Sequence, residues 1–373
     1  MRKTFFRVAL MAVALCGFTA CDDEDKDVPE PDLGGITDDG GEGQPGEVVT
    51  VGAYILNTGN WGKNDASIQY LDKEKGTLSE DLYAAANGEG LGDLGQDLCL
   101  YGSKLYVTVS NSSKLVVMDK NCKALKTLNL TDNAGIPVEP RYMTAVGGNV
   151  YFTSYEGTVS RLDTVSLEVT GKVAVGDHPE AIANANGKLF VNISGYGKEN
   201  KVAVVDVATF TKERDIEMLL NPYTQCKVGA DGFVYVVSNG NYAGKPSLAP
   251  EDYIYGTLQR INPKTYEVEQ LCRASYIANH GDKMYILYSE YYLPELTRAY
   301  VYDVKTGAES PFFDLTTLSS PNSIDIDPVN GDVYVTNAPY GATSDVYVYT
   351  KDGELKTKFG VGNSASKVLF VTK

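Results

Sequence analysis

The amino-acid sequence predicts an all-β protein: a seven-bladed β-propeller of four-stranded blades, closed by pairing of the C-terminal strand with the first N-terminal strand. The main observation is a repeat in which an aromatic residue flanked by aliphatic residues occurs seven times, spaced 39 to 52 residues apart. Periods of this length are typical of propeller blades, and leucine-rich repeats are shorter. The second observation is that the repeat starts and stops within a blade. The seven aromatic residues are Tyr54, Tyr106, Tyr151, Phe190, Tyr235, Tyr285 and Tyr334.

Each repeat carries the turn residues of an antiparallel sheet. Gly-containing turns precede most of the aromatic strands, at residues 102–103, 147–148, 186–187, 231–232, 281–282 and 330–331. Another short strand follows each aromatic strand and usually ends in Asp or Asn, whose side chain can bond the backbone two residues on. These Asp-terminated strands are predicted at 68–72, 115–119, 159–163, 202–206, 258–262, 299–303 and 346–350. We therefore expect each blade to contain an inner strand, the aromatic strand, the Asp-terminated strand and a polar outer strand.

The two ends of the repeat region complete one blade between them. Tyr54 lies on an aromatic strand with no inner strand before it, and residues 366–372 form an inner strand with nothing after it. Pairing of residues 368–371 with the stretch around Ile55 would close the ring and leave no long exposed sheet edge. Residues 48–51 are weakly patterned and could add a further edge strand.

The N-terminus has the features of a lipoprotein signal. Residues 1–20 combine a basic start with a short apolar run, which cannot span a bilayer of about 30 Å. Thr19 and Ala20 directly before Cys21 resemble a lipobox, which predicts lipidation of Cys21. Ordinary secretion with an unmodified Cys21 is the alternative. Cys16 is a poorer candidate because the bulky Leu15 precedes it.

An acidic segment rich in Gly and Pro follows at residues 21–47. Such a composition buries too little apolar surface to fold, so we expect a flexible tether between Cys21 and a propeller at 48–373. The run 22–25, Asp-Asp-Glu-Asp, resembles an export signal that directs lipoproteins to the outer face of the outer membrane. A plain acidic spacer, or retention at the inner membrane, is the other interpretation.

The pattern of aromatics, Gly turns and Asp resembles the YncE-like seven-bladed propellers. The opening 54–62, Tyr-Ile-Leu-Asn-Thr-Gly-Asn-Trp-Gly, together with the lipobox and tether, resembles surface lipoproteins of Bacteroidetes type, which include the cobalamin-binding BtuG family. This resemblance implies cell-surface capture of a corrinoid (vitamin B12-type) and its transfer to a TonB-dependent outer-membrane transporter.

One face of the predicted disc is rich in tyrosine and side-chain amides. It contains the connectors that lead into the inner strands and those that follow the aromatic strands. Tyrosine offers a large ring with a hydrogen-bonding tip, and amides both donate and accept, so this face suits a large, nearly neutral ligand bearing amides or hydroxyls. A corrinoid fits, and a glycan is the alternative. The candidate ligand-binding residues are Asn60, Trp61, Asn111, Tyr142, Tyr155, His178, Tyr196, Tyr223, Gln225, Asn239, Tyr242, Tyr291, Asn322 and Tyr340.

Several of these residues have plainer interpretations. Tyrosine is also a common strand residue, so a loop tyrosine can pack a blade without touching a ligand. His178 could be an axial ligand to cobalt, a general base, or a loop histidine that bonds neighbouring backbone. The long connector 239–255 is either a lid over a ligand or a variable surface loop.

The sequence predicts a binding protein without a cofactor, and not an enzyme. The predicted mature chain has two histidines, His178 and His280, and neither lies in a metal-ligand or catalytic-triad motif. The alternative is a lactonase-like, metal-dependent hydrolase, whose metal would be held near the axis by Asp97, Glu180, Gln225 and Asn322. A third class is an interaction protein that docks a partner subunit.

The charge argues against two classes of partner, and the cysteine spacing argues against a metal site. The formal net charge is −16 and there is no basic stripe, which argues against nucleic acid and anionic lipid surfaces. Outside the signal region, Cys99, Cys122, Cys226 and Cys272 match no metal motif. An exported protein can form disulfides, so buried thiols and disulfides are both open for these four cysteines.

Overall fold

The computed structural model describes residues 47–132 and 134–373. Within them, twenty-eight strands form seven antiparallel sheets of four strands each, which confirms the predicted seven-bladed propeller. The predicted signal peptide, Cys21 and nearly all of the acidic tether lie outside the described residues.

The strand order within each sheet is inner, aromatic, Asp-terminated and outer. Blade 1 consists of β28 (Ala365–Thr372), β1 (Thr50–Asn57), β2 (Ser67–Asp72) and β3 (Thr77–Leu78). Blade 2 consists of β4 (Gly95–Tyr101), β5 (Lys104–Val109), β6 (Lys114–Met118) and β7 (Ala124–Asn129). Blade 3 consists of β8 (Pro140–Val146), β9 (Asn149–Ser154), β10 (Thr158–Asp163) and β11 (Val169–Ala174).

The other four blades repeat this order. Blade 4 consists of β12 (Pro179–Ala185), β13 (Lys188–Ile193), β14 (Lys201–Asp206) and β15 (Thr211–Glu217). Blade 5 consists of β16 (Pro222–Val228), β17 (Val234–Ser238), β18 (Thr257–Ile261) and β19 (Val268–Arg273). Blade 6 consists of β20 (Tyr276–His280), β21 (Lys283–Glu290), β22 (Leu293–Asp303) and β23 (Glu309–Pro311). Blade 7 consists of β24 (Pro321–Ile326), β25 (Val333–Asn337), β26 (Thr343–Tyr349) and β27 (Leu355–Asn363).

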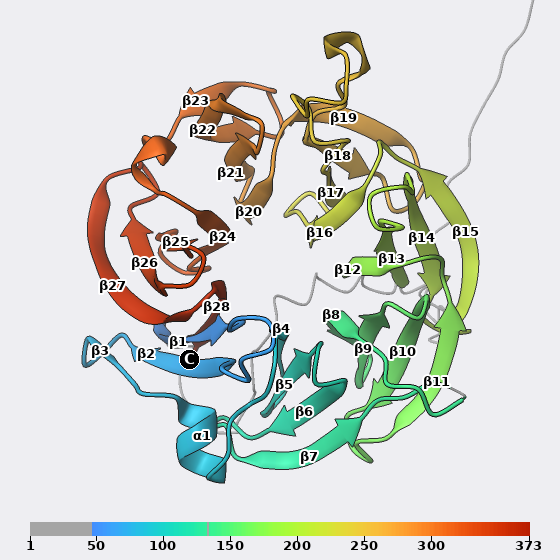
Figure 1. Ribbon diagram of the computed structural model, residues 1–373, viewed down its shortest axis with the longest axis vertical. Coiled ribbons are helices and arrows are strands. Elements are labelled where there is room, and N and C mark those ends of the chain that lie inside the picture. Colours follow the sequence, from blue (N-terminus) through green and yellow to red (C-terminus); the bar gives the residue numbers. More distant parts are fainter. Residues whose placement is uncertain (1–46, 133) are drawn as a thin grey trace, which may run out of the picture. The chain divides into compact units, whose positions relative to one another are not determined.

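The blades stand in a closed ring around a central axis (Figure 1). Each inner strand contacts the inner strands of both neighbouring blades, and the series β4, β8, β12, β16, β20, β24, β28 returns to β4. Short turns with positive φ connect several inner strands to the aromatic strands, for example Asn186 (φ 48°) and Gly187 (φ 70°). Positive φ at both positions is the signature of a type I′ hairpin, as the Asn-Gly dipeptide predicts.

The closure predicted from the chain ends is confirmed. β1 pairs antiparallel with β28, and Ile55 lies opposite Val368. Residues 50–51 are not part of an extra edge strand, because they extend β1, where Thr50 lies opposite Thr372. The Val49 amide donates to the carbonyl of Lys373 at 3.0 Å and continues the same ladder.

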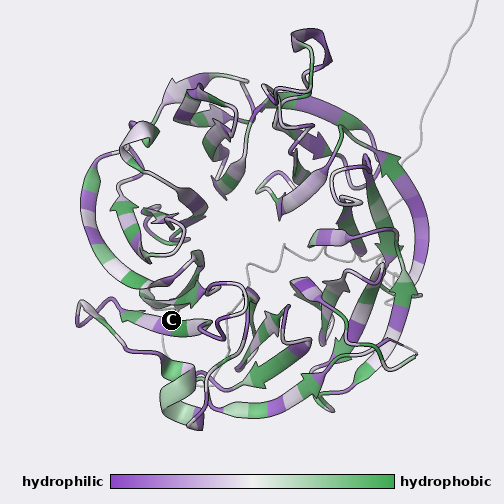
Figure 2. Cartoon of the chain, in the orientation of Figure 1, coloured by the Kyte–Doolittle hydropathy of each residue, from purple (hydrophilic) through white to green (hydrophobic). Residues whose placement is uncertain are grey.

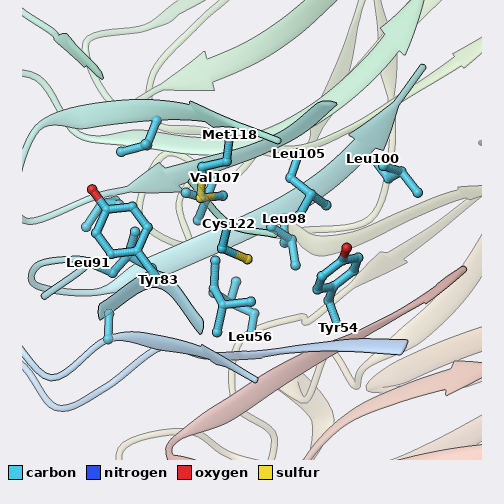
Figure 3. Close-up of a cluster of buried hydrophobic side chains, with 14 residues drawn as sticks. Tyr54, Leu56, Tyr83, Leu91, Leu98, Leu100, Leu105, Val107, Met118 and Cys122 are labelled. Atoms are coloured by element: carbon cyan, nitrogen blue, oxygen red, sulfur yellow. The ribbon is translucent and has the colours of Figure 1, made fainter. Parts of the chain in front are cut away.

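Apolar clusters between neighbouring blades form the core. Figure 3 shows the cluster between blades 1 and 2, where Tyr54 and Leu56 of β1 face Leu98 of β4 and Val107 of β5. Outer strands such as β11 alternate between half-buried and exposed residues, and Figure 2 shows them as alternating hydrophobic and hydrophilic bands. The aromatic strands, which stand second in each sheet, therefore pack the blades against one another, and the outer strands face water.

Three short helices lie in the connections. They are α1 (Leu82–Asn87), the 3-10 turn η1 (Pro250–Asp252) and the 3-10 turn η2 (Leu315–Thr317). Asp81 caps α1 by accepting from the amides of Tyr83 and Ala84, and Gly88 ends it in the left-handed conformation. The helix places Tyr83 in the apolar cluster between blades 1 and 2, where the sequence pattern predicts only a polar outer strand.

Candidate functional site

A cavity of about 660 Å³ lies on the axis of the ring, and all seven blades contribute to its lining. Its wall is formed by the inner strands and by the connectors at the face where these strands begin. This is the face that the sequence predicts for binding. Its volume falls within the range of roughly 300–1,000 Å³ that is usual for ligand pockets.

Seven of the fourteen predicted ligand-binding residues line this cavity. They are Tyr142, Tyr223, Gln225, Asn239, Tyr242, Tyr291 and Asn322. Tyr291 has an exposed fraction of 84% and Tyr242 of 50%, so both present their rings to solvent around the cavity. Tyr291 stands at the tip of a two-residue hairpin between β21 and β22, since β22 begins at Leu293, several residues earlier than the predicted strand.

The other seven predicted residues do not line the cavity. Two of them bond aspartates of nearby loops: the Asn60 amide group donates to Asp65 of its own loop at 3.1 Å, and that of Asn111 donates to Asp93 in the connector before β4. Two others, Trp61 and Tyr340, are exposed. The last three, which belong to blades 3 and 4, are Tyr155, His178 and Tyr196.

These three rings form an aromatic cluster. The His178 ring centroid lies 4.8 Å from that of Tyr155 and 4.4 Å from that of Tyr196, with both contacts edge-on. The Arg141 guanidinium lies 4.4 Å from the centroid of the Tyr155 ring, a cation–π distance. His178 Nδ1 is 2.7 Å from an oxygen of Asp177. The cluster is therefore held together by its own contacts beside the cavity.

A buried ion pair connects this cluster with the cavity wall. Arg141 of β8 lies 3.0 Å from the Glu180 carboxylate of β12 and donates to Gln96 at 2.5 Å. The Tyr155 hydroxyl donates to the other Glu180 oxygen at 2.6 Å. Burial raises the pKa of Glu180 above its usual range, although Arg141 and Tyr155 oppose this shift. Burial also raises the pKa of Tyr223 to about 12, so that hydroxyl remains protonated at neutral pH.

A second group of charges lies further along the inner strands, and we call it the charged floor: Asp97, Lys227, Asp325 and Lys367. All four line the cavity. The Lys367 ammonium is 2.6 Å from Asp97, and the Lys227 ammonium is 3.6 Å from Asp325. Burial lowers the pKa of Lys227, and Asp325 offsets this effect only in part. For Lys367, burial is outweighed by Asp97, so its pKa is raised.

Lys227, Asp325 and Lys367 were not among the residues predicted from the sequence. One signal could have found the first of them. In β16, Tyr223, Gln225 and Lys227 are spaced two apart, as are residues on one face of a regular strand, and all three line the cavity although the ladder is irregular between Pro222 and Cys226. Two of these three residues were predicted as ligand contacts, so the same alternation pointed to the third.

The four side chains proposed for a hydrolytic metal site have other partners. Asp97 pairs with Lys367 and Glu180 with Arg141. The Gln225 side-chain oxygen accepts from the Ile277 amide at 3.3 Å, and the Asn322 amide group donates to the Ala365 carbonyl at 2.9 Å. Within residues 47–132 and 134–373, no group of three or more His, Cys, Asp or Glu is arranged to hold a metal ion.

Three of the cysteines, Cys122, Cys226 and Cys272, are free thiols. Burial raises the pKa of Cys122 to about 12 and that of Cys272 to about 11, so both are protonated at neutral pH. Cys99 lies half-buried in β4. Among the described residues, no helix is both long and apolar enough to cross a membrane.

Solved structures with a similar fold come from unrelated contexts. Apo AztD from Citrobacter koseri is 11% identical, with a TM-score of 0.55 over 87% of this chain and 99% of that one. Hydrazine synthase from Kuenenia stuttgartiensis is 18% identical, with a TM-score of 0.52 over 67% of this chain and 74% of that one. The computationally designed protein Ika8 is 11% identical, with a TM-score of 0.51 over 85% and 96%. At these identities, the likeness concerns the fold alone.

No curated protein matches the chain. One family model does, and it covers residues 51–361, which is nearly the whole propeller from β1 into β27. The chain therefore belongs to the family described as a domain of unknown function, DUF5074.

Proposed function

We propose that the protein binds a large, mainly neutral molecule rich in amides or hydroxyls in its axial cavity, and that this molecule is a corrinoid. The observation that carries the proposal is the lining of the cavity. Tyrosine rings and side-chain amides from several blades surround about 660 Å³ of space, among them Tyr142, Tyr223, Asn239 and Asn322.

The charges near the cavity support a mainly neutral ligand. Arg141 is paired with Glu180, and Lys367 with Asp97. Burial raises the pKa of Glu290, whose carboxylate accepts from the Gly256 amide at 2.7 Å. Since opposite charges already face one another, a ligand of high net charge would have to compete with existing pairs. A macrocycle fringed with carboxamides needs ring surfaces and amide partners, and the lining supplies both.

We further propose that lipid on Cys21 anchors the protein at the outer face of the outer membrane, and that the bound ligand passes to a TonB-dependent transporter. This part rests on the resemblance of the lipobox, the acidic tether and the opening segment 54–62 to surface lipoproteins. Metabolic labelling with a clickable fatty acid tests the anchor, because a Cys21→Ala variant should lose the label.

A glycan is the second candidate ligand, and the exposed rings favour it. Tyr291, at 84% exposed, and Trp61, at 77%, could stack on the faces of sugar rings. A metal-dependent hydrolase has less support, because the four candidate ligands already have partners in the protein.

Calorimetry with cyanocobalamin tests the proposed function directly. We expect saturable heat at micromolar protein, and we expect Tyr242→Ala combined with Tyr291→Ala to weaken binding by roughly tenfold or more, as is usual for truncated aromatic anchors. Tyr340→Ala is the matched control, because Tyr340 is exposed on the same face but does not line the cavity. All three side chains are at least half exposed, so these variants should fold.

Two outcomes would contradict the proposal. An absence of heat with cyanocobalamin removes the corrinoid, and a glycan array then tests the second candidate. Equal losses for the Tyr340→Ala variant and for the double variant would mean that the ligand lies on the outer loops and not in the cavity.

A further inference from the structure

We propose that the charged floor of the cavity is an anion subsite, in which the Lys227 ammonium, with Lys367 nearby, binds a carboxylate or phosphate group of the ligand. The inference deepens the proposed function, and it rests on that function only in placing a ligand in the cavity. The bound molecule would thus be mainly neutral, with one anionic group directed down the axis.

The position of Lys227 supports a subsite below the tyrosine-rich mouth. The inner strands begin at the mouth, and Lys227 is the sixth residue of β16. It lies past the irregularity that interrupts the β16–β17 ladder between Pro222 and Cys226, near the end of the strand away from the mouth. Asp325 is the fifth of six residues in β24, at a similar depth. Lys227 nevertheless faces the cavity, since it belongs to the lining and 32% of its side chain is exposed.

The two aspartates of the charged floor have backbone donors of their own. Asp97 accepts from the Leu98 amide at 2.9 Å and from the Met143 amide at 2.8 Å. Asp325 accepts from the Val368 amide at 2.9 Å. Each aspartate therefore keeps a backbone hydrogen-bond donor whether or not Lys227 is close. Both oxygens of Asp97 therefore have backbone donors, whereas Asp325 has one on a single oxygen and Lys227 beside the other.

Lys227 is the loosely held member of the group. Its ammonium lies 3.6 Å from Asp325, beyond the length of a direct hydrogen bond, whereas Lys367 is 2.6 Å from Asp97. An ammonium group has three donors, so Lys227 keeps donors for a ligand oxygen while Asp325 stays close. The positive charge of Lys367 also acts on Lys227. An arriving anion would relieve this repulsion and could approach Lys227 more closely than Asp325 does.

Affinity labelling with pyridoxal 5′-phosphate tests the subsite without knowledge of the natural ligand. If one lysine holds the phosphate, the amine of the other can attack the aldehyde and expel water to form an imine. Borohydride then adds hydride to the imine carbon and leaves a stable secondary amine, which peptide mass mapping locates. We expect label on Lys227 or Lys367 about tenfold above that on the exposed Lys75, the factor that one charge-assisted hydrogen bond supplies. Inorganic phosphate should suppress it.

Pyridoxal, which lacks the phosphate, is the matched control and should label without preference. Lys227→Met should abolish the preference for Lys367, Lys227→Arg should preserve it, and Lys75→Met should leave it unchanged. Urea unfolding of each variant verifies the fold. Equal labelling by pyridoxal and its phosphate, or labelling that inorganic phosphate does not reduce, would overturn the subsite.

The two proposals fail separately. If cyanocobalamin binds normally and the labelling shows no preference, only the anion subsite is wrong. If the labelling is selective but cyanocobalamin gives no heat, the subsite stands and the ligand is another molecule with an anionic group.

Discussion

The inner strand β16 and the aromatic strand β17 of blade 5 differ in what their side chains face. All five residues of β17, the second strand of blade 5, are buried, whereas β16 beside it has one buried residue in seven. The second strands are packed between neighbouring blades, and the inner strands line the axis. In blade 5, therefore, the aromatic strand supplies buried apolar surface, and its neighbour supplies side chains that line the cavity. Substitutions in the two strands should have different effects.

The largest expected loss of stability comes from a substitution in an aromatic strand. Phe190 of β13 is fully buried in the cluster between blades 4 and 5. We expect Phe190→Ala to lower the free energy of unfolding by about 3–5 kcal/mol, because the substitution removes buried surface and leaves a cavity. Urea unfolding followed by circular dichroism measures the change. Lys227→Met is the control on an inner strand, with an expected change below about 1 kcal/mol. If Phe190→Ala and Lys227→Met lowered the free energy of unfolding by similar amounts, the different roles of the aromatic and inner strands would be contradicted.

The local apolar pattern of the aromatic strands explains why the sequence could predict the fold. Phe190, Tyr235 and the other central aromatics are flanked by aliphatics within one strand, so the pattern that makes them buried is local and can be counted. The closure could be predicted as well, because residues 366–372 form a strand with no partner of their own, and pairing them with the stretch around Ile55 completes a blade.

The site was only partly predictable, because its contacts join different blades. Lys367 and Asp97 are 270 residues apart in sequence and 2.6 Å apart in space, and no local pattern predicts such a pair. Tyr155 and His178 were placed on the correct face, but they contact one another beside the cavity and do not line it. Trp61 has the composition of a ligand contact, yet its loop leaves it exposed away from the cavity lining.

The second prediction concerns an ion pair between two inner strands. Arg141→Met should destabilise the protein by about 3 kcal/mol, since it leaves the nearly buried Glu180 without its cation. Arg141→Met combined with Glu180→Met should be less destabilised than the single variant, because no unpaired charge remains. Urea unfolding of the two single variants and the double variant gives the coupling between them. Additive losses would show that the pair contributes through packing alone.

The smallest expected effect distinguishes two aspartates at the same end of one inner strand, β24. Asp325 faces the cavity near the end of β24, and Asp327, two residues later, accepts from Lys73 and Thr50 of blade 1. Burial alone would raise the pKa of Asp327, but these donors and the Val329 amide outweigh it and hold that pKa below its usual value. A pKa that is lower in the folded state contributes stability above the unfolded pKa of about 3.9, and this contribution is lost as the pH falls through the folded value.

Asp327→Asn should therefore lower stability by about 1 kcal/mol at neutral pH, and the difference from the parent protein should shrink as the pH falls from about 6 to about 3. Thermal unfolding of both proteins across this range measures it. The paired variant Asp325→Asn serves as the comparison, because Asp325 also bonds blade 1, through the Val368 amide, but the cation beside it is Lys227 of blade 5 and not a lysine of blade 1. A difference for Asp327→Asn that stays constant with pH would mean that the carboxylate stabilises this joint through its shape and hydrogen bonds, and that its charge contributes nothing to ring closure.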